Sequence, residues 1–362
     1  MMAQHVTVVG AGVFGGWTAW HLRRGGASVT LVDAWGPGHS RASSGGESRI
    51  IRMGYGPDEI YTRMAMRSLE QWKTLGHGLF HRTGVLWIGR EGHEYTTATR
   101  ETLARLAIPT ELLDAGELAR RYPQMRFADR GLYGIFEPES GALMARRAVA
   151  EVVADAVRMG VRYETTSAPP RAEVTVYACG PWLPKLFPEI LGERIFPTRQ
   201  EVFFFAPPAG DTRFAPSHFP AWIDFADPRG PYGFPDLESR GFKLAFDRHG
   251  PPFDPDTGDR RLTGEGLAAA RQFLAERFPD LRNAPLTESR VCQYENTSNG
   301  DFLIDRHPEH ENIWFIGGGS GHGYKHGPAV GEYVAGRILR DSAAEARFSL
   351  GSKSAVQSRT VW

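Results

Sequence analysis

Near the start of the chain, an apolar strand pattern leads directly into a glycine turn of the form G-x-G-x-x-G. The strand covers His5–Val9, the glycines are Gly10, Gly12 and Gly15, and a helical pattern follows over 14–24. Glycines at these positions let the backbone approach a pyrophosphate group at the N-terminus of the helix. This pattern predicts that the first part of the chain folds as a doubly wound nucleotide-binding unit.

The residues after the glycine turn support the same interpretation. Ala19 and Leu22 give the helix an apolar face toward the sheet, and a second strand over 28–33 ends at Asp33. A Rossmann unit places at this point the acid that binds ribose hydroxyls. The motif alone is weak, but a strand before it and an acid after it make chance a poor explanation.

The rest of the chain alternates between two kinds of pattern. Short strands and charged helices occupy 84–142, and aromatic strands occupy 197–247, whereas apolar strands that end in glycines recur at 174–180 and 312–319. Helical patterns are predicted at 58–75, 146–159 and 267–278. The predicted fold class is therefore α/β, a Rossmann-like nucleotide-binding domain with an interleaved substrate domain built on a mixed or antiparallel sheet.

The predicted domains are discontinuous. We expect 1–80, 145–195 and 291–345 to form the nucleotide-binding domain, with the strand at 312–319 rejoining its sheet. We expect 81–144 and 196–290 to form the substrate domain, and 346–362 to form a polar tail that is loosely ordered after Arg347.

Composition excludes several classes of partner. Lys plus Arg and Asp plus Glu both total 42, so no net charge attracts nucleic acid or an anionic membrane. The N-terminus shows no signal-peptide pattern, and no apolar run is long enough to span a bilayer. The sequence predicts a soluble, cytoplasmic protein.

Metal and disulfide sites are not expected. Cys179 and Cys292 are the only cysteines, too few for a disulfide framework or a structural zinc site. His307, Glu309 and His310 lack the H-E-x-x-H spacing, so a loop after Asp305 is the better interpretation.

Further motifs follow in a fixed order along most of the chain. They are the glycine turn with Leu31-Val32-Asp33, Ser48-Arg49-Ile50-Ile51-Arg52, Tyr232-Gly233-Phe234-Pro235 followed by Lys243, Cys292-Gln293-Tyr294, Asp305-Arg306-His307-Pro308-Glu309-His310 and Ser320-Gly321-His322-Gly323-Tyr324-Lys325. In these motifs the chain resembles the monomeric sarcosine oxidase and N-methyltryptophan oxidase family, within the D-amino-acid-oxidase-like flavoproteins.

The resemblance implies that FAD occupies the Rossmann cradle and is covalently attached through Cys292 at the flavin 8α-methyl group. The alternative is a buried structural thiol, which is the better interpretation of Cys179. The residues then expected to bind FAD are Gly10, Gly12, Val13, Phe14, Gly15, Asp33, Ala34, Ser43, Ser48, Arg49, Gly180, Trp182, Cys292, Gly319, Gly321 and Lys325.

Cations in these motifs suit the oxidation of an amino acid. Arg52 and Lys325 are expected to clamp the substrate carboxylate, so that the reacting C–H bond points at flavin N5. Lys243 is expected to stabilise the anion formed when oxygen accepts electrons, and Arg49 to face the flavin ring. Ordinary surface ion pairs and an exposed lysine are the competing interpretations.

Other motif residues are expected to line the substrate pocket: His322, given a catalytic role, and Tyr232, Tyr294 and Asp247. Asp247 stands where such oxidases often carry a histidine. It faces substrate or pairs with Arg248 or a backbone amide.

The function implied is an FAD-dependent oxidase that converts an amino acid, N-substituted or a cyclic secondary amine, to an imine and hydrogen peroxide. The expected partners are a small-molecule substrate and O2, and the expected state is a monomer. A flavin dehydrogenase that passes electrons to a protein acceptor and an NAD-dependent enzyme are the alternatives. The sequence does not identify the substrate side chain.

Overall fold

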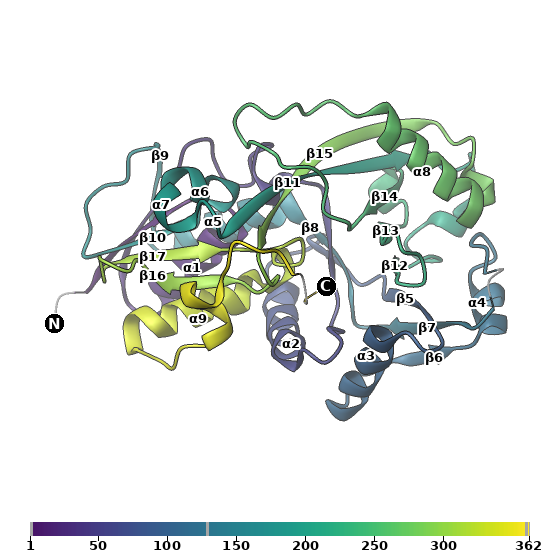
Figure 1. The fold of residues 1–362 in the computed structure, drawn as a ribbon, viewed down its shortest axis with the longest axis horizontal. Coiled ribbons are helices and arrows are strands. Elements are labelled where there is room, and N and C mark those ends of the chain that lie inside the picture. Colours follow the sequence, from purple (N-terminus) through teal and green to yellow (C-terminus); the bar gives the residue numbers. More distant parts are fainter. Residues whose placement is uncertain (1–2, 128–129, 359–360, 362) are drawn as a thin grey trace.

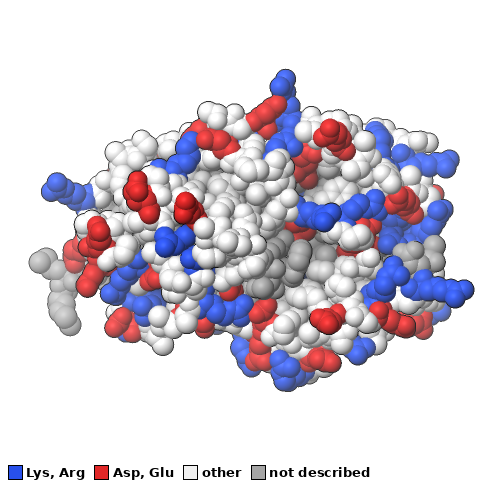
Figure 2. Space-filling model, viewed as in Figure 1, with Lys and Arg blue, Asp and Glu red and all other residues white. Residues whose placement is uncertain are grey.

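The computed structural model describes residues 3–127, 130–358 and 361. Within those residues, the strands form a six-stranded sheet, an eight-stranded sheet and a three-stranded sheet, with helices packed around them (Figure 1). In that same part of the chain, no helix is both long and apolar enough to cross a bilayer. Lys, Arg, Asp and Glu are interspersed over the face shown in Figure 2, without a large area of one sign.

The six-stranded sheet contains the predicted nucleotide-binding unit, in the order β16-β17-β10-β1-β2-β9. Its strands are β1 (His5–Val9), β2 (Ser28–Asp33), β9 (Arg162–Thr165), β10 (Val174–Tyr177), β16 (Leu303–Arg306) and β17 (Ile313–Gly317). The five strands from β17 to β9 are parallel, and β16 adds an antiparallel edge. The strand at the end of the chain therefore rejoins the first sheet, as expected.

Three helices cover this sheet: α1 (Val13–Arg24), α5 (Ala145–Arg158) and α9 (Gly327–Arg340). Because α1 begins at the carboxyl end of β1, its N-terminus faces the edge where doubly wound sheets bind their ligands.

The eight-stranded sheet has the order β15-β11-β14-β13-β12-β5-β7-β6. Its strands are β5 (Val85–Arg90), β6 (Glu111–Leu113), β7 (Leu132–Glu137), β11 (Ile195–Phe205), β12 (Ala221–Asp224), β13 (Pro231–Phe234), β14 (Phe242–Phe246) and β15 (Leu286–Thr297). β12 and β5 pair in parallel, and the other neighbours pair antiparallel. The predicted fold class is confirmed.

A three-stranded antiparallel sheet of β3 (Ser48–Ile51), β8 (Gly141–Met144) and β4 (Phe80–His81) completes the strands. The remaining helices are α2 (Glu59–Thr74), α3 (Glu94–Arg105), α4 (Ala115–Arg121), α6 (Leu183–Leu186), α7 (Pro188–Leu191) and α8 (Gly264–Arg277).

Two long strands join the two large sheets in space. β11 and β15 pair along their whole length, from Ile195 opposite Thr297 to Phe205 opposite Leu286 (Figure 1). β15 crosses the domain boundary expected at 290, and the division of the chain into domains stays a prediction. The crossing matters because β15 carries Cys292 and Tyr294.

Helix α9 was not expected from the sequence. Glycines interrupt its apolar pattern, and glycine is a poor helix former. The structure shows why one of them is there: a Cβ atom at Gly331 would lie 2.5 Å from the backbone carbon of Trp17 in α1. The glycine therefore lets α9 pack closely against α1.

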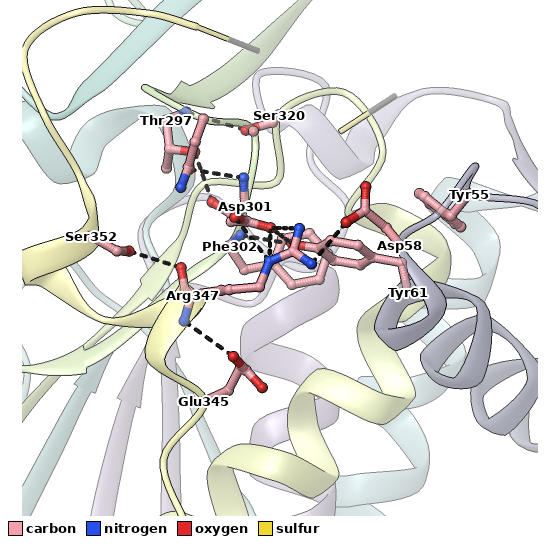
Figure 3. Close-up of polar contacts among 12 residues, drawn as sticks. Tyr55, Asp58, Tyr61, Thr297, Asp301, Phe302, Ser320, Glu345, Arg347 and Ser352 are labelled. Carbon is pink, nitrogen blue, oxygen red and sulfur yellow. Dashed lines mark hydrogen bonds and ion pairs between the residues drawn. The ribbon is translucent and has the colours of Figure 1, made fainter. Parts of the chain in front are cut away.

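The start of the predicted tail is held by buried contacts, although loose order was expected after Arg347 (Figure 3). Arg347 forms ion pairs of 2.8 Å with Asp58 and with Asp301, and the Tyr61 hydroxyl donates to Asp301 at 2.7 Å. Phe348 is only 1% exposed. The polar composition of the tail concealed these anchors.

We expect the variant Arg347→Ala to lower the free energy of unfolding by about 2 kcal/mol, because Asp301 would stay buried without its guanidinium partner. Urea unfolding of the purified protein measures this change. Arg261→Ala is the control: its pair with Asp259 is exposed to solvent, so its loss should leave the free energy of unfolding nearly unchanged. Equal effects of the two variants would contradict the account.

Candidate functional site

A cavity of about 340 Å³ opens at the carboxyl ends of β1, β2 and β10, and we call it the cradle. Thirteen of the residues predicted to bind the cofactor line it: Gly10, Gly12, Val13, Phe14, Asp33, Ala34, Ser43, Arg49, Gly180, Trp182, Cys292, Gly319 and Gly321. Residues distant in sequence therefore meet in one cavity.

The glycine turn is shaped for a ligand close to its backbone. Gly10 has φ +104°, and a Cβ atom there would lie 2.4 Å from the carbonyl oxygen of Ala178. At Gly12 a Cβ atom would point into open space, with only Ser44 Oγ near it, at 3.5 Å. Gly15 does not line the cradle; a Cβ atom there would overlap the Gly10 carbonyl oxygen, so this glycine lets α1 begin directly against the turn.

Asp33 organises the same turn. Its Oδ2 accepts the Ala11 N–H at 2.8 Å, and its Oδ1 accepts the N–H groups of Trp35 and Gly36, each at 2.8 Å. Ser44 Oγ accepts the Val13 N–H at the first turn of α1, at 3.0 Å. These bonds fix the backbone of the cradle, and Asp33 remains on the cavity wall.

Two cations meet at Ser48, beside the cradle. Arg49 donates to the carbonyls of Ser48 and Ser43, at 2.8 and 2.6 Å, and Lys243 donates to Ser48 O and Oγ, at 2.9 and 3.1 Å. Lys243 is 3% exposed, so the exposed-lysine interpretation is wrong. Among the described residues, neither cation forms an ion pair with a carboxylate. Burial, and then the Arg49 charge, lower the pKa of Lys243 well below its ordinary value.

Arg49 also contacts the thiol predicted to carry the cofactor. Its Nη2 lies 3.5 Å from Cys292 Sγ, and Cys292 is 7% exposed. Cys179 lies after the end of β10, at the edge of the cradle, where burial and then nearby carboxylates raise the pKa of its thiol to about 12. Of the two cysteines, Cys292 is the one beside a cation.

Tyr55 joins the two cations of the predicted carboxylate clamp. Lys325 Nζ donates to its hydroxyl at 2.6 Å, and the Arg52 guanidinium lies 4.5 Å from the centre of its ring and 4.5 Å from that of Trp87. Arg52 and Lys325 are each 5% exposed, which excludes surface ion pairs. Two further residues predicted to bind FAD, Lys325 and Ser48, do not line the cradle. Lys325 donates to the Tyr55 hydroxyl, and Ser48 accepts from Lys243.

Sequence reasoning missed Tyr55 and His326. The His326 Nε2 atom lies 2.7 Å from the Tyr55 hydroxyl, and His322 Nδ1 lies 3.3 Å from it. The available signal was spacing, since Tyr55 closely follows Arg52. His322 also stacks on Phe302 and approaches the Gly300 carbonyl at 2.9 Å, so it lies in a buried layer behind the clamp. Its catalytic role stays a prediction.

The remaining predicted pocket residues form one group. Tyr294 lines the cradle, and its hydroxyl donates to Asp247 Oδ1 at 2.9 Å. Tyr232 lies beside them, and burial raises the pKa of its hydroxyl to about 12. Asp247 therefore contacts a tyrosine of the site. Within the described part of the chain, no group of three metal-binding side chains is found.

The comparisons with known proteins agree with this geometry. The family model for FAD dependent oxidoreductases matches residues 5–337. A monomeric sarcosine oxidase from Bacillus sp. (strain B-0618) is 32% identical over 91% of this chain and 90% of that protein.

The chain belongs to the sarcosine-oxidase-like FAD-dependent oxidoreductases.

Two further members of the comparison extend this result. The N-methyl-L-tryptophan oxidase of Salmonella heidelberg (strain SL476) is 28% identical over 92% of this chain and 94% of that protein. The solved structure of L-proline dehydrogenase from P. horikoshii has a TM-score of 0.82 at 20% identity, covering 96% of this chain and 97% of that one. At that identity it supports the shared fold alone. The predicted resemblance is confirmed.

The residues present fit the FAD of this family. The glycines leave room for a pyrophosphate against the backbone, Asp33 stands where ribose binds, and Glu295 Oε1 is buried without a hydrogen-bond partner among the described residues. A bound ligand with polar groups would supply hydrogen-bond partners to the polar groups of this cavity.

We expect Tyr55→Phe to weaken the binding of a non-reactive carboxylate such as acetate by about tenfold or more. Without the Tyr55 hydroxyl, the Lys325 ammonium is no longer held in the position that binds an anion. The flavin absorption spectrum of the holoenzyme reports this binding. Tyr61→Phe is the matched control, since Tyr61 is equally buried but bonds Asp301. Acetate affinity that falls equally in both variants would contradict the assignment.

Proposed function

We propose that this protein is an FAD-dependent oxidase of an amino acid, N-substituted or a cyclic secondary amine, that yields an imine and hydrogen peroxide. The observation that carries the proposal is the placement of Arg52 and Lys325 on the ring of Tyr55. Relatives named for sarcosine and N-methyl-L-tryptophan support an N-substituted substrate.

In the proposed reaction, Arg52 and Lys325 hold the substrate carboxylate. Arg52 is held between two aromatic rings, so its planar guanidinium is oriented before substrate arrives. Lys325 adds a point charge, fixed by Tyr55 and by the His322 carbonyl at 2.9 Å. Bound FAD supplies the two-electron oxidant, and the clamp sets which C–H bond faces it.

Lys243 is proposed to act in the oxygen half of the reaction. Its buried ammonium group lacks an ion-pair partner among the described residues, so an anion formed beside it would both gain stabilisation and favour the charged lysine. Arg49 adds a second positive charge, since its guanidinium donates to the same Ser48 carbonyl. Tyr232, Tyr294 and Asp247 are proposed to line the substrate pocket, with His322 supporting the clamp.

The covalent bond to Cys292 is part of the proposal. Arg49 Nη2 lies 3.5 Å from the Cys292 sulfur, so a fixed positive charge faces the atom that would bond the flavin. We further propose that the protein acts as a monomer in the cytoplasm, on a small molecule and O2, without nucleic acid or membrane partners.

A panel of amino acids, assayed for peroxide, tests the proposed function. N-methylated and cyclic secondary amino acids should give peroxide at higher kcat/KM than the matching primary amino acids. Sarcosine against glycine and proline against norvaline are the matched pairs. A panel without peroxide, but with reduction of a dye acceptor, would indicate the dehydrogenase alternative.

The variant Lys243→Met should slow reoxidation of the substrate-reduced protein by oxygen at least about a hundredfold, while anaerobic reduction by substrate changes only a few-fold. Stopped-flow absorbance separates the two steps. Lys185→Met is the control, because Lys185 forms exposed ion pairs with Asp254 and Asp256. A normal reoxidation rate in Lys243→Met removes this lysine from the mechanism.

Acid precipitation should leave the yellow colour in the protein pellet, and the intact mass should exceed that of the chain by one FAD. Cys292→Ser should lose both signs, whereas Cys179→Ser should keep them. Colour in the wild-type supernatant would show that the flavin is not covalent.

A further inference from the structure

A buried carboxyl group lies inside the cradle without an assigned role. Glu295 stands on β15, is 7% exposed and lines the cavity. Its Oε1 faces the end of β17, where a Cβ atom at Gly317 would lie 2.2 Å from it, and its Oε2 would lie 3.9 Å from one at Gly180. Oε1 is fully buried and has no hydrogen-bond partner in the described part of the chain.

The surroundings of this carboxyl favour its neutral form. Burial raises the pKa of Glu295 to about 8, although the N–H groups of Gly318 and Gly319 act in the opposite direction. The facing titratable group is the Cys179 thiol, and Asp33 and Asp256 line other parts of the same wall. On α6 the neighbour is the apolar Leu183. Lys185 of α6 pairs with Asp254 and Asp256, and among the described residues no ion pair is formed by Glu295.

FAD presents acceptors to such a group, namely its pyrophosphate oxygens, its ribityl hydroxyls and the carbonyl oxygens of its ring. Glu295 lines the same cavity as Gly10, Gly12 and Gly319, so an FAD bound there would lie beside this carboxyl. A carboxylate there would repel the pyrophosphate, whereas a carboxylic acid can donate a hydrogen bond to it.

We infer that Glu295 binds FAD as a neutral carboxylic acid, donating its O–H to an acceptor oxygen of the cofactor, and that its ionisation weakens FAD binding. At pH values below the pKa of Glu295, the proton stays on its carboxyl group. At higher pH the proton passes to solvent, and the charge that remains opposes the anionic cofactor. The inference rests on the FAD of this family and not on the proposed substrate.

The test is FAD affinity as a function of pH in Cys292→Ser protein, where the cofactor binds reversibly. Quenching of FAD fluorescence gives Kd at pH 7 and pH 9. With Glu295 present, Kd should rise by about tenfold at pH 9, because a group of pKa about 8 is then mostly ionised. Adding Glu295→Gln should keep tight binding at pH 7 and abolish the rise, since the amide also donates and does not ionise.

Two further variants keep the test decisive. Glu295→Ala should bind more weakly at pH 7 but show no rise at pH 9. Asp256→Asn should keep the tenfold rise, because Lys185 and Trp182 bond the Asp256 carboxyl and lower its pKa, so it stays ionised throughout. An equal rise in the proteins with and without Glu295 overturns the inference. Peroxide production is measured separately, so its absence would count against the proposed function alone.

Discussion

The site depends on two buried cations that meet at one serine. Arg49 and Lys243 both donate to the Ser48 carbonyl, and neither forms an ion pair with a carboxylate in the described part of the chain. Burying a charge without a partner is costly, and carbonyl dipoles offset only part of that cost. These costs lower the pKa of Lys243, whereas the pKa of Arg49 is raised, so an anionic ligand or an anion formed during a reaction would favour the charged form of Lys243.

The fold brings these groups together from separate sheets. The six-stranded sheet supplies the cradle, β3 of the small sheet supplies Ser48 and Arg49, and β14 and β15 of the eight-stranded sheet supply Lys243 and Cys292. Because Cys292 and Arg49 stand on different sheets, a shift of one sheet relative to the other would move Cys292 away from Arg49. The distance between Cys292 and Arg49 therefore depends on how the sheets pack against each other.

Local patterns carried most of what could be predicted. The glycine turn and Asp33 are contiguous signals whose spacing fixes their geometry, so β1, α1, β2 and most cradle residues were found. Elements that depend on tertiary contacts were not predicted. Helix α9 has a glycine at 331 because that position packs closely on Trp17, and the start of the tail is held because Arg347 reaches Asp58 and Asp301. Tyr55 and Glu295 carry no motif of their own; their importance appears only when other segments surround them.

The central claim is that the buried cations serve a reaction that ends at oxygen. The most direct measurement reduces the wild-type holoenzyme anaerobically with its best substrate, and then mixes it with air-saturated buffer while absorbance and peroxide are followed. The account predicts that the flavin reoxidises completely within about seconds, with one peroxide formed for each flavin. A flavin that stays reduced for minutes in air, yet transfers its electrons at once to a dye or protein acceptor, would contradict it.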